Sequence, residues 1–259
     1  MSSAIVGHTG FVGSNIARAR TFDHYFNSSN IEDAHGQRFD LLVFSAAKAE
    51  KWRINQNPAE DERHISELEA HLSRISADRV VLISTVDVYG SPQHVDERSP
   101  IDTESLHPYG THRLRLERFV EDHFDRSHVL RLPGLFGPGL KKNVIFDLMT
   151  DNNVERAHTD AEFQYYDLAR LWDDIEKVID LDIPLLNVTS EPIATGDVAE
   201  IVLGRSFVNR PDGIAPIRYD VRSVHASAWS GDDGYLYDRT SVLSDLRTFV
   251  ESNGRKAPR

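Results

Sequence analysis

The chain has 259 residues, 40% of them hydrophobic and 27% charged, which is enough apolar sequence for one large globular domain or two small ones. It contains no cysteine, which excludes disulfides, a thiolate nucleophile and a cysteine zinc site, and indicates a reducing compartment. The net charge of −12 argues against nucleic acid or an anionic membrane as a partner. No apolar run is long enough to span a membrane, and the first motif starts too early to leave room for a signal peptide. We therefore expect a cytoplasmic protein.

Short apolar strands alternate with helices in the first half of the chain. The predicted strands are residues 3–6, 24–26, 39–44, 79–85 and 129–132, and the predicted helices are 11–20, 59–75 and 109–124. Such alternation is typical of crossover units with a parallel sheet. We therefore predict an α/β fold, a Rossmann-type doubly wound parallel sheet whose ligands lie beyond the carboxyl ends of the strands.

The pattern changes after Pro133. Residues 134–139 are rich in glycine and predict a loop. Beyond them we predict helices over 144–149, 168–179, 196–203 and 242–250, and strands over 163–167 and 185–188. We expect a dinucleotide-binding domain of residues 1–132 plus about 163–184. A smaller mixed α/β substrate-binding domain would then comprise 133–162 and 185–259.

Three glycines spaced three apart follow the first predicted strand. Gly7 allows a tight turn out of the strand, and Gly10 lets a pyrophosphate sit on main-chain N–H groups at a helix N-terminus. Gly13 lets that helix pack close to the strand. The spacing and its strand–helix context predict a nucleotide, and specifically a dinucleotide, at this turn. A glycine-rich loop without a ligand is the alternative.

A second group of polar residues follows a later strand. Thr85 ends the predicted strand 79–85, and Tyr109 and Arg113 lie four apart on one face of a predicted helix. A phenol ionises near pH 10, and a fixed cation one turn away favours the phenolate, so we expect Arg113 to lower the pKa of Tyr109. Thr85 could share the proton and orient a substrate oxygen. The alternatives are a tyrosine anchored at a turn and a threonine that caps backbone.

Seven stretches in order resemble the extended short-chain dehydrogenases/reductases of the NAD-dependent epimerase/dehydratase type, most of which act on nucleotide sugars. They are residues 7–13, 45–47, 84–90, 109–113, 131–139, 166–167 and 187–199. The resemblance implies that Thr85 is the catalytic hydroxyl and Tyr109 the general acid/base. It also implies that the C-terminal part holds the nucleotide of the substrate, and that helices 59–75 and 109–124 form a homodimer interface.

The motifs and the resemblance together give a set of expected site residues. The catalytic residues are Thr85, Tyr109 and Arg113. The expected cofactor ligands are Gly7, Thr9, Gly10, Phe11, Val12, Gly13, Asn27, Ser28, Ser45, Ala46, Ala47, Tyr109, Arg113 and Pro133. The expected substrate ligands are Ser84, Val86, Asp87, Lys142 and Asn143. We expect no metal site, because the 12 histidines are scattered without ligand spacing.

Three positions depart from the family pattern. Arg113 replaces the lysine of Tyr-x-x-x-Lys; it keeps the positive charge but cannot release a proton near neutral pH, which affects proton exchange more than cofactor binding. Related dehydratases carry an acid followed by a glutamate where this chain has Val86 and Asp87, so their catalytic pair is incomplete. An asparagine usual in the helix after Pro58 is replaced near His64.

Residues 27–30 bear on the choice between NAD and NADP. A carboxylate about twenty residues past the first glycine usually binds the ribose of NAD, whereas residues 27–30 read Asn-Ser-Ser-Asn. We therefore expect NAD or NADP, with a slight preference for NADP. The expected activity is epimerisation or keto-reduction of a nucleotide sugar. The alternatives are a catalytically weak NAD(P)-binding module or sensor, and a nucleotide-sugar dehydratase that uses Asp87 as base.

Overall fold

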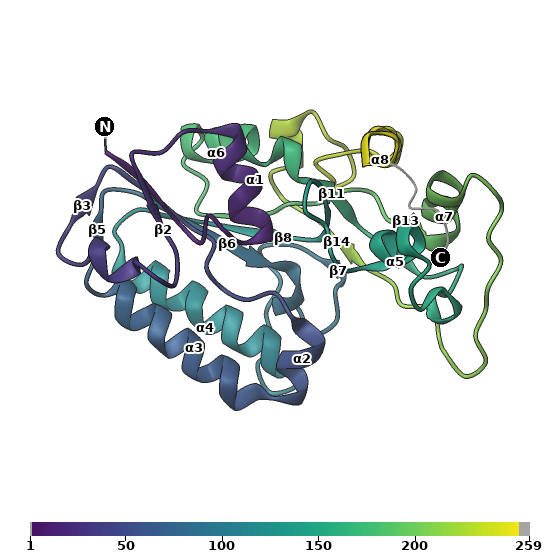
Figure 1. The fold of residues 1–259 in the computed structure, drawn as a ribbon, viewed down its shortest axis with the longest axis horizontal. Coiled ribbons are helices and arrows are strands. Elements are labelled where there is room, and N and C mark those ends of the chain that lie inside the picture. Colours follow the sequence, from purple (N-terminus) through teal and green to yellow (C-terminus); the bar gives the residue numbers. More distant parts are fainter. Residues whose placement is uncertain (1, 254–259) are drawn as a thin grey trace. The chain divides into compact units, whose positions relative to one another are not determined.

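A computed structural model describes residues 2–253, and these form two compact units (Figure 1). The first unit comprises the chain up to residue 91 together with 99–132 and 169–186. The second comprises 92–98, 133–168 and the chain from 187 onward. Each unit is described below by itself.

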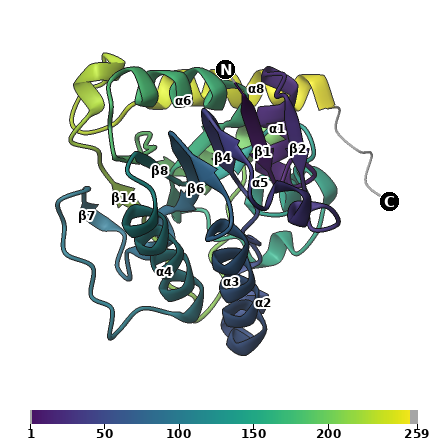
Figure 2. The same ribbon diagram turned by 90° about the vertical axis from the view of Figure 1, so that its left-hand side faces the viewer.

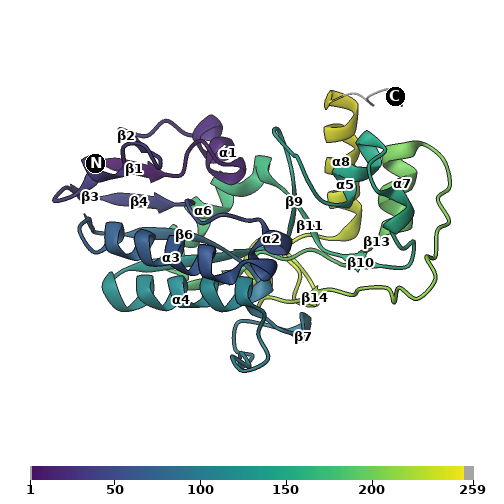
Figure 3. The ribbon, with the colours of Figure 1, turned by 60° about the horizontal axis from the view of Figure 1, so that its bottom comes forward.

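The first unit is built on a six-stranded parallel sheet, as the alternating sequence pattern predicted (Figure 3). The strand order is β12-β8-β6-β4-β1-β2. The strands are β1 (Ser3–Val6), β2 (His24–Phe26), β4 (Leu41–Phe44), β6 (Val80–Thr85), β8 (Ser127–Leu132) and β12 (Leu185–Asn187). The strands β2 and β4 lie on opposite sides of β1, so the direction in which successive strands are added reverses there. Doubly wound sheets bind their ligands at such a reversal, beyond the carboxyl ends of the strands.

Helices cover both faces of this sheet (Figure 2). One face carries α1 (Phe11–Ala19) and α6 (Leu171–Asp180), and the other carries α3 (Pro58–Leu72) and α4 (Pro108–His123). Strands covered on both faces read as continuous apolar runs, which is why β1, β4, β6 and β8 were evident in the sequence. The helices α3 and α4 begin with a proline at their first position, where the missing N–H has no intrahelical partner to lose.

Several elements of the first unit differ from the sequence expectation. The helix α2 (Lys51–Gln56) was not predicted at all. The predicted strand 39–44 is divided, because β3 (Arg38–Phe39) leaves the central sheet and pairs in parallel with β5 (Ser76–Ala77). Short 3₁₀ turns connect the elements of both units: η1 (Ile31–Ala34), η2 (Val86–Val88), η3 (Val154–Arg156), η4 (Leu168–Arg170) and η5 (Ala226–Trp229).

Among the described residues, the second unit contains three pairs of strands, each strand two or three residues long, and three α-helices. Its strands are β7 (Gln93–Val95), β9 (Gly134–Phe136), β10 (Glu162–Phe163), β11 (Tyr165–Asp167), β13 (Ile193–Ala194) and β14 (Asp220–Val221). Its helices are α5 (Val144–Thr150), α7 (Thr195–Leu203) and α8 (Arg239–Asn253). The predicted stripe on α8 is buried in the core of this unit through Val242, Leu246, Phe249 and Val250.

Strand pairing explains where the two units divide. Residues 134–136 form β9 rather than the predicted loop, because they pair in parallel with β11. Residues 163–168, which we expected in the dinucleotide-binding domain, therefore lie in the second unit. Residues 92–98 lie there as well, because β7 pairs with β14. Within residues 2–253, none of the helices has the length and apolarity to cross a membrane.

Candidate active site

The turn between β1 and α1 requires glycine at two of its three glycine positions. Gly7 has φ +91°, in the left-handed region, and a Cβ there would lie 2.7 Å from the carbonyl carbon of Ser45. A Cβ on Gly13 would lie 2.2 Å from the carbonyl oxygen of Gly7. The turn is closed by a hydrogen bond of 2.9 Å from the Gly10 N–H to the same oxygen. These contacts are the tight turn and the close packing that the spacing predicted.

The N-terminus of α1 is open to a ligand. Gly10 caps the helix without a side-chain hydrogen bond to its first turn, and Thr9 and Gly10 are exposed. A Cβ on Gly10 would meet only the Gly7 carbonyl oxygen within 4 Å, at 3.3 Å, so the space beside it is empty. Unpaired N–H groups and the positive end of the helix dipole bind phosphate. The residues present therefore fit the pyrophosphate of a dinucleotide.

The remaining predicted cofactor ligands of the first unit lie around this turn. Phe11 and Val12 are half-buried on α1, and Ser45, Ala46 and Ala47 are half-buried directly after β4. Beyond β2, the Asn27 side-chain oxygen accepts hydrogen bonds from the backbone and hydroxyl of Ser29, and Ser28 is exposed. No carboxylate stands in residues 27–30, so nothing there repels a 2′-phosphate.

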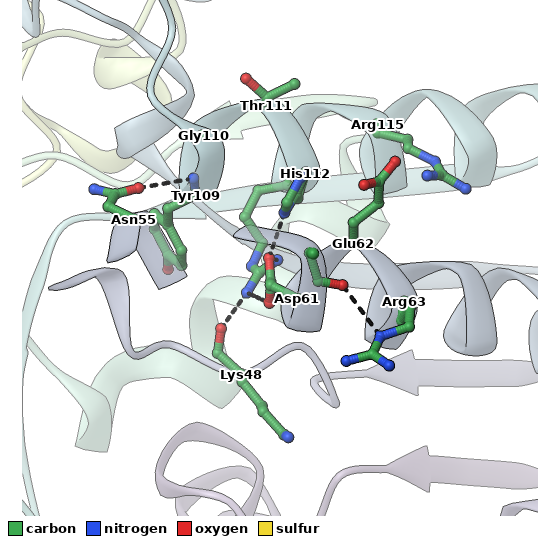
Figure 4. A network of polar contacts seen from close by, with 12 residues as sticks. Lys48, Asn55, Asp61, Glu62, Arg63, Tyr109, Gly110, Thr111, His112 and Arg115 are labelled. Atoms are coloured by element: carbon green, nitrogen blue, oxygen red, sulfur yellow. Dashed lines mark hydrogen bonds and ion pairs between the residues drawn. The ribbon is translucent and has the colours of Figure 1, made fainter. Parts of the chain in front are cut away.

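Tyr109, Arg113 and Asp61 form a buried cluster between α4 and α3 (Figure 4). The guanidinium carbon of Arg113 lies 4.7 Å from the centre of the Tyr109 ring, a cation–π contact. Both terminal nitrogens of Arg113 donate to the Asp61 carboxylate at 3.1 Å, and one also donates to the Lys48 carbonyl. His112 adds a contact of 2.7 Å between its Nδ1 and the same carboxylate. The cation that sequence analysis placed beside Tyr109 is therefore paired with an acid that sequence analysis missed.

This environment changes the ionisation of two groups. Burial raises the pKa of Tyr109; the charge of Arg113 and hydrogen bonding with Thr85 and Arg113 lower it, and the charge of Asp87 raises it further. Arg113 therefore acts in the expected direction, but burial outweighs it, so the pKa of Tyr109 lies above its ordinary value. Burial also raises the pKa of Asp61, but the hydrogen bonds and charges of Arg113 and His112 outweigh it and hold that pKa below its ordinary value.

Thr85 and Asp87 lie at the end of β6, beside Tyr109. The Thr85 hydroxyl oxygen accepts a hydrogen bond of 3.2 Å from the Asp87 N–H, as a cap of η2, and Thr85 is among the groups that lower the pKa of Tyr109. The Asp87 carboxylate forms an ion pair of 2.8 Å with Lys51 on α2. Val86 is buried. Thr85 thus has the capping role that we considered, and its catalytic role stays a prediction.

Ser84, a predicted substrate ligand, is buried in a different network. Its hydroxyl donates to Glu117 on α4, and Glu117 forms a buried ion pair of 2.6 Å with Arg131 on β8. Arg131 also donates to the Tyr89 hydroxyl at 2.8 Å. The hydroxyl of Ser84 is therefore used to join β6 to α4, inside the first unit. Glu117 was not anticipated, because a single acid in a helix gives no sign of its partner.

The helix α2 and the start of α3 line a shallow hollow that is open to solvent. The ring of His64 lines this hollow, and its buried Nε2 has no hydrogen-bond partner among the described residues. Burial lowers the pKa of His64. On α2 itself, Trp52 is 75% exposed.

Three predicted site residues belong to the second unit. Pro133 is half-buried between β8 and β9, and Lys142 is exposed. Asn143 caps α5: its side-chain oxygen accepts from the N–H groups of Ile145 and Phe146, and its amide donates to the Leu135 carbonyl. Asn143 therefore has a structural role in its own unit. Within residues 2–253, no group of three or more His, Asp or Glu side chains could hold a metal ion.

Comparison with known proteins shows the family to which the chain belongs. The model of the NAD dependent epimerase/dehydratase family matches residues 4–175, which include the glycine turn, Thr85, Tyr109 and Arg113. The chain belongs to this family. No curated protein sequence matches it significantly.

Solved structures of the same fold cover nearly the whole chain. A dTDP-4-dehydrorhamnose reductase from Clostridium acetobutylicum is 14% identical with a TM-score of 0.74, over 98% of this chain and 99% of that one. A UDP-N-acetylglucosamine 4-epimerase from Methanobrevibacter ruminantium is 14% identical with a TM-score of 0.75, over 96% and 97%. MoeE5 in complex with UDP-glucuronic acid and NAD is 17% identical with a TM-score of 0.74, over 98% and 99%. At these identities the similarity shows the fold.

Proposed function

We propose that the protein is an NAD(P)-dependent enzyme that epimerises a nucleotide sugar or reduces its keto form. The observation that carries the proposal is the buried Tyr109 phenol, with the Arg113 guanidinium over its ring, in a family member whose glycine turn fits a dinucleotide. When bound, the nicotinamide cofactor takes hydride from a sugar carbon or gives hydride to it.

In the proposed reaction, Tyr109 exchanges a proton with the oxygen on the reacting carbon. Thr85 shares a hydrogen bond with that oxygen and fixes its position. Because the pKa of Tyr109 is raised, its phenol is protonated near neutral pH and begins as an acid. A protonated phenol can deliver a proton to a ketone oxygen, and the phenolate that remains can accept one from an alcohol, so Tyr109 could serve either direction of the proposed reaction.

Arg113 stabilises the phenolate that remains after the proton has left. Its guanidinium stays charged at any pH near neutrality, and its position over the Tyr109 ring is fixed by Asp61 and the Lys48 carbonyl. We also propose Arg113 and Tyr109 as contacts of the cofactor ribose. Arg113 donates three hydrogen bonds to protein oxygens. A guanidinium has five N–H donors, so we propose that the remaining donors are used by a ligand.

The absence of an acid after β2 supports a preference for NADP over NAD.

We further propose that the second unit binds the nucleotide of the substrate, with Lys142 contacting its phosphates. The protein is proposed to be cytoplasmic. We also propose a homodimer through α3 and α4, which lie side by side on one face of the first unit (Figure 2). Light scattering at micromolar concentration tests the dimer, and a monomer there contradicts it.

A catalytically weak NAD(P)-binding module is the second candidate, because Arg113 is paired with Asp61 and cannot release a proton. The two candidates are separated by comparing the wild type with Tyr109→Phe on a panel of nucleotide sugars and their 4-keto derivatives, with NAD(H) and NADP(H). An enzyme loses about 10²-fold or more of its turnover in Tyr109→Phe while it still binds the cofactor. Absence of turnover in the wild type, with intact cofactor binding, favours the module. Absence of NAD and NADP binding in calorimetry rejects both.

The dehydratase alternative remains a third proposal, because Asp87 lies beside Thr85 at the end of β6. Replacement Asp87→Asn separates it from the others. Loss of water elimination, with hydride transfer retained, supports Asp87 as a base. Unchanged activity removes the dehydratase proposal.

A further inference from the structure

Lys51 brings a positive charge to the region around Tyr109 from an element that the sequence did not predict. Its Nζ lies 2.8 Å from Oδ1 of Asp87, and the two side chains are 39% and 19% exposed. Asp87 follows Thr85 in η2, and its charge acts on Tyr109. The ion pair therefore connects α2 to the end of the strand that carries the candidate catalytic threonine.

The position of α2 beside Tyr109 is fixed by a second contact. The side-chain oxygen of Asn55 on α2 accepts a hydrogen bond of 3.0 Å from the Tyr109 N–H, at the first turn of α4 (Figure 4). This N–H is one of the helix-terminal donors that have no partner within the helix. Lys51 and Asn55 lie four apart on α2, so they share one face of it. That face is directed at η2 and the start of α4.

The charged and titratable groups around Tyr109 come from four elements. They are Arg113, His112 and the capping His107 of α4, Asp61 of α3, Asp87 of η2, Lys51 of α2, and Lys48 before α2, whose carbonyl bonds Arg113. The His107 ring stacks near Tyr109, with 6.2 Å between ring centres, and burial lowers the pKa of His107. Asp61 pairs with Arg113, and Asp87 pairs with Lys51.

We propose that Lys51 is a positioning residue for the proton exchange of Tyr109: its ammonium, kept beside the site by Asp87, balances the Asp87 carboxylate while Asp61 balances Arg113. This inference rests on the proposed role of Tyr109. Lysine has a long flexible stem, and its half-exposed ammonium stays at the site because Asp87 holds it there. Without Lys51, the charges near the phenol gain one unit of negative charge, which disfavours the phenolate.

The experiment measures the ionisation of residue 109 directly. 3,5-Difluorotyrosine placed at position 109 gives one ¹⁹F signal, and its phenol ionises at a lower pH than tyrosine, within the range where the protein is folded. The titration is compared in the otherwise wild-type protein, Lys51→Met, Asp87→Asn and the double variant. Lys51→Arg tests rescue of the charge. Arg53→Met is the matched control, because Arg53 lies on the same helix but pairs with the exposed Glu60.

We expect Lys51→Met to raise the midpoint of this titration by about half a unit to one unit, as the loss of one partly exposed charge implies. Lys51→Arg and Arg53→Met leave it unchanged. In the Asp87→Asn background the effect of Lys51→Met falls to less than half, since Lys51 is then no longer held at the site. An unchanged midpoint in Lys51→Met, or an equal shift with and without Asp87, overturns the proposal.

Activity gives an independent readout. If the enzyme turns over a nucleotide sugar, Lys51→Met should move the pH profile of kcat/KM to higher pH by the same amount, whereas a merely structural role lowers activity at every pH. The ¹⁹F titration does not require turnover. Failure of the proposed function, seen as absent cofactor binding or a fully active Tyr109→Phe, is therefore distinguishable from failure of the proposed role of Lys51.

Discussion

The guanidinium of Arg113 lies against the carboxylate of Asp61, with each terminal nitrogen 3.1 Å from one carboxylate oxygen. The two side chains are 3% and 2% exposed, so both charges are removed from water. A buried charge is tolerated only with a partner of this quality. The pair therefore fixes the cation over the Tyr109 ring and joins α3 to α4.

Removing the charge of Asp61 should destabilise the fold. In Asp61→Asn the guanidinium of Arg113 stays buried without a counter-ion, and we expect a loss of about 3 kcal/mol in the free energy of unfolding. Chemical denaturation measures this loss. Glu60→Gln is the control, because Glu60 lies one residue away and pairs with Arg53 at the surface; it should cost about 0.5 kcal/mol or less. If the two substitutions lower the free energy of unfolding equally, the buried pair contributes no more to stability than the surface pair.

The same pair should make stability depend on pH in the acid range. The pKa of Asp61 is lower in the folded protein than its ordinary value of 3.8, so the unfolded chain binds the proton more readily. The contribution of Asp61 is therefore full above the unfolded value and is lost as the pH falls through the lower folded value. The difference in stability between the wild type and Asp61→Asn should be constant from pH 7 to pH 5 and shrink below about pH 4. A difference that grows on acidification would contradict this assignment.

Two glycines of the nucleotide turn should respond differently to alanine. In Gly13→Ala the new Cβ would lie 2.2 Å from a backbone oxygen, so the turn must move, and we expect a loss of about 2 kcal/mol or more in stability. In Gly10→Ala the nearest atom is 3.3 Å away, so the fold should be kept. Dinucleotide affinity should nevertheless fall tenfold or more, about 1.4 kcal/mol, because the methyl group occupies the place of the pyrophosphate. Calorimetry and thermal melting separate the two effects, and unchanged affinity in Gly10→Ala would remove the pyrophosphate from this position.

An acid placed after β2 should change the choice of cofactor. Ser28 is exposed, so Ser28→Asp is accommodated without disturbing the Asn27–Ser29 turn. The new carboxylate repels a 2′-phosphate, and we expect the affinity for NADP to fall about tenfold relative to NAD. Ser28→Asn serves as the uncharged control. If Ser28→Asp leaves the ratio of the two dissociation constants unchanged, the adenosine ribose lies elsewhere.

The parts of the fold that local sequence determines were the parts that could be predicted. Strands buried on both faces require continuous apolar runs, and such runs marked β1, β4, β6 and β8. The glycine turn was evident because its conformation excludes a side chain at Gly7 and Gly13. By contrast, α2 has six residues and a single buried side chain, Ile54, so it has no apolar stripe to detect.

The charged contacts of the site depend on pairing between distant residues, and this could not be predicted from local patterns. Asp61 lies in the first turn of α3, where an acid is ordinary, and its partner Arg113 is 52 residues away. One signal was present: an arginine on the same helix face as a catalytic tyrosine needs a counter-ion if it is buried. Likewise β9 was taken for a loop, because nothing in its glycine-rich sequence indicates the β11 strand with which it pairs.

Because Trp52 is exposed, its fluorescence should report the binding of a ligand near it. An indole that is three-quarters in water emits at long wavelength, and it sits next to Lys51 on the short helix that borders Tyr109. Any compound that covers this helix should shift the emission to shorter wavelength. Of the other two tryptophans, Trp172 is buried and Trp229 is half-buried, and Trp52→Phe gives the emission of these two alone. Candidate ligands can thus be screened by the shift of the fluorescence emission maximum, before any assay of turnover exists.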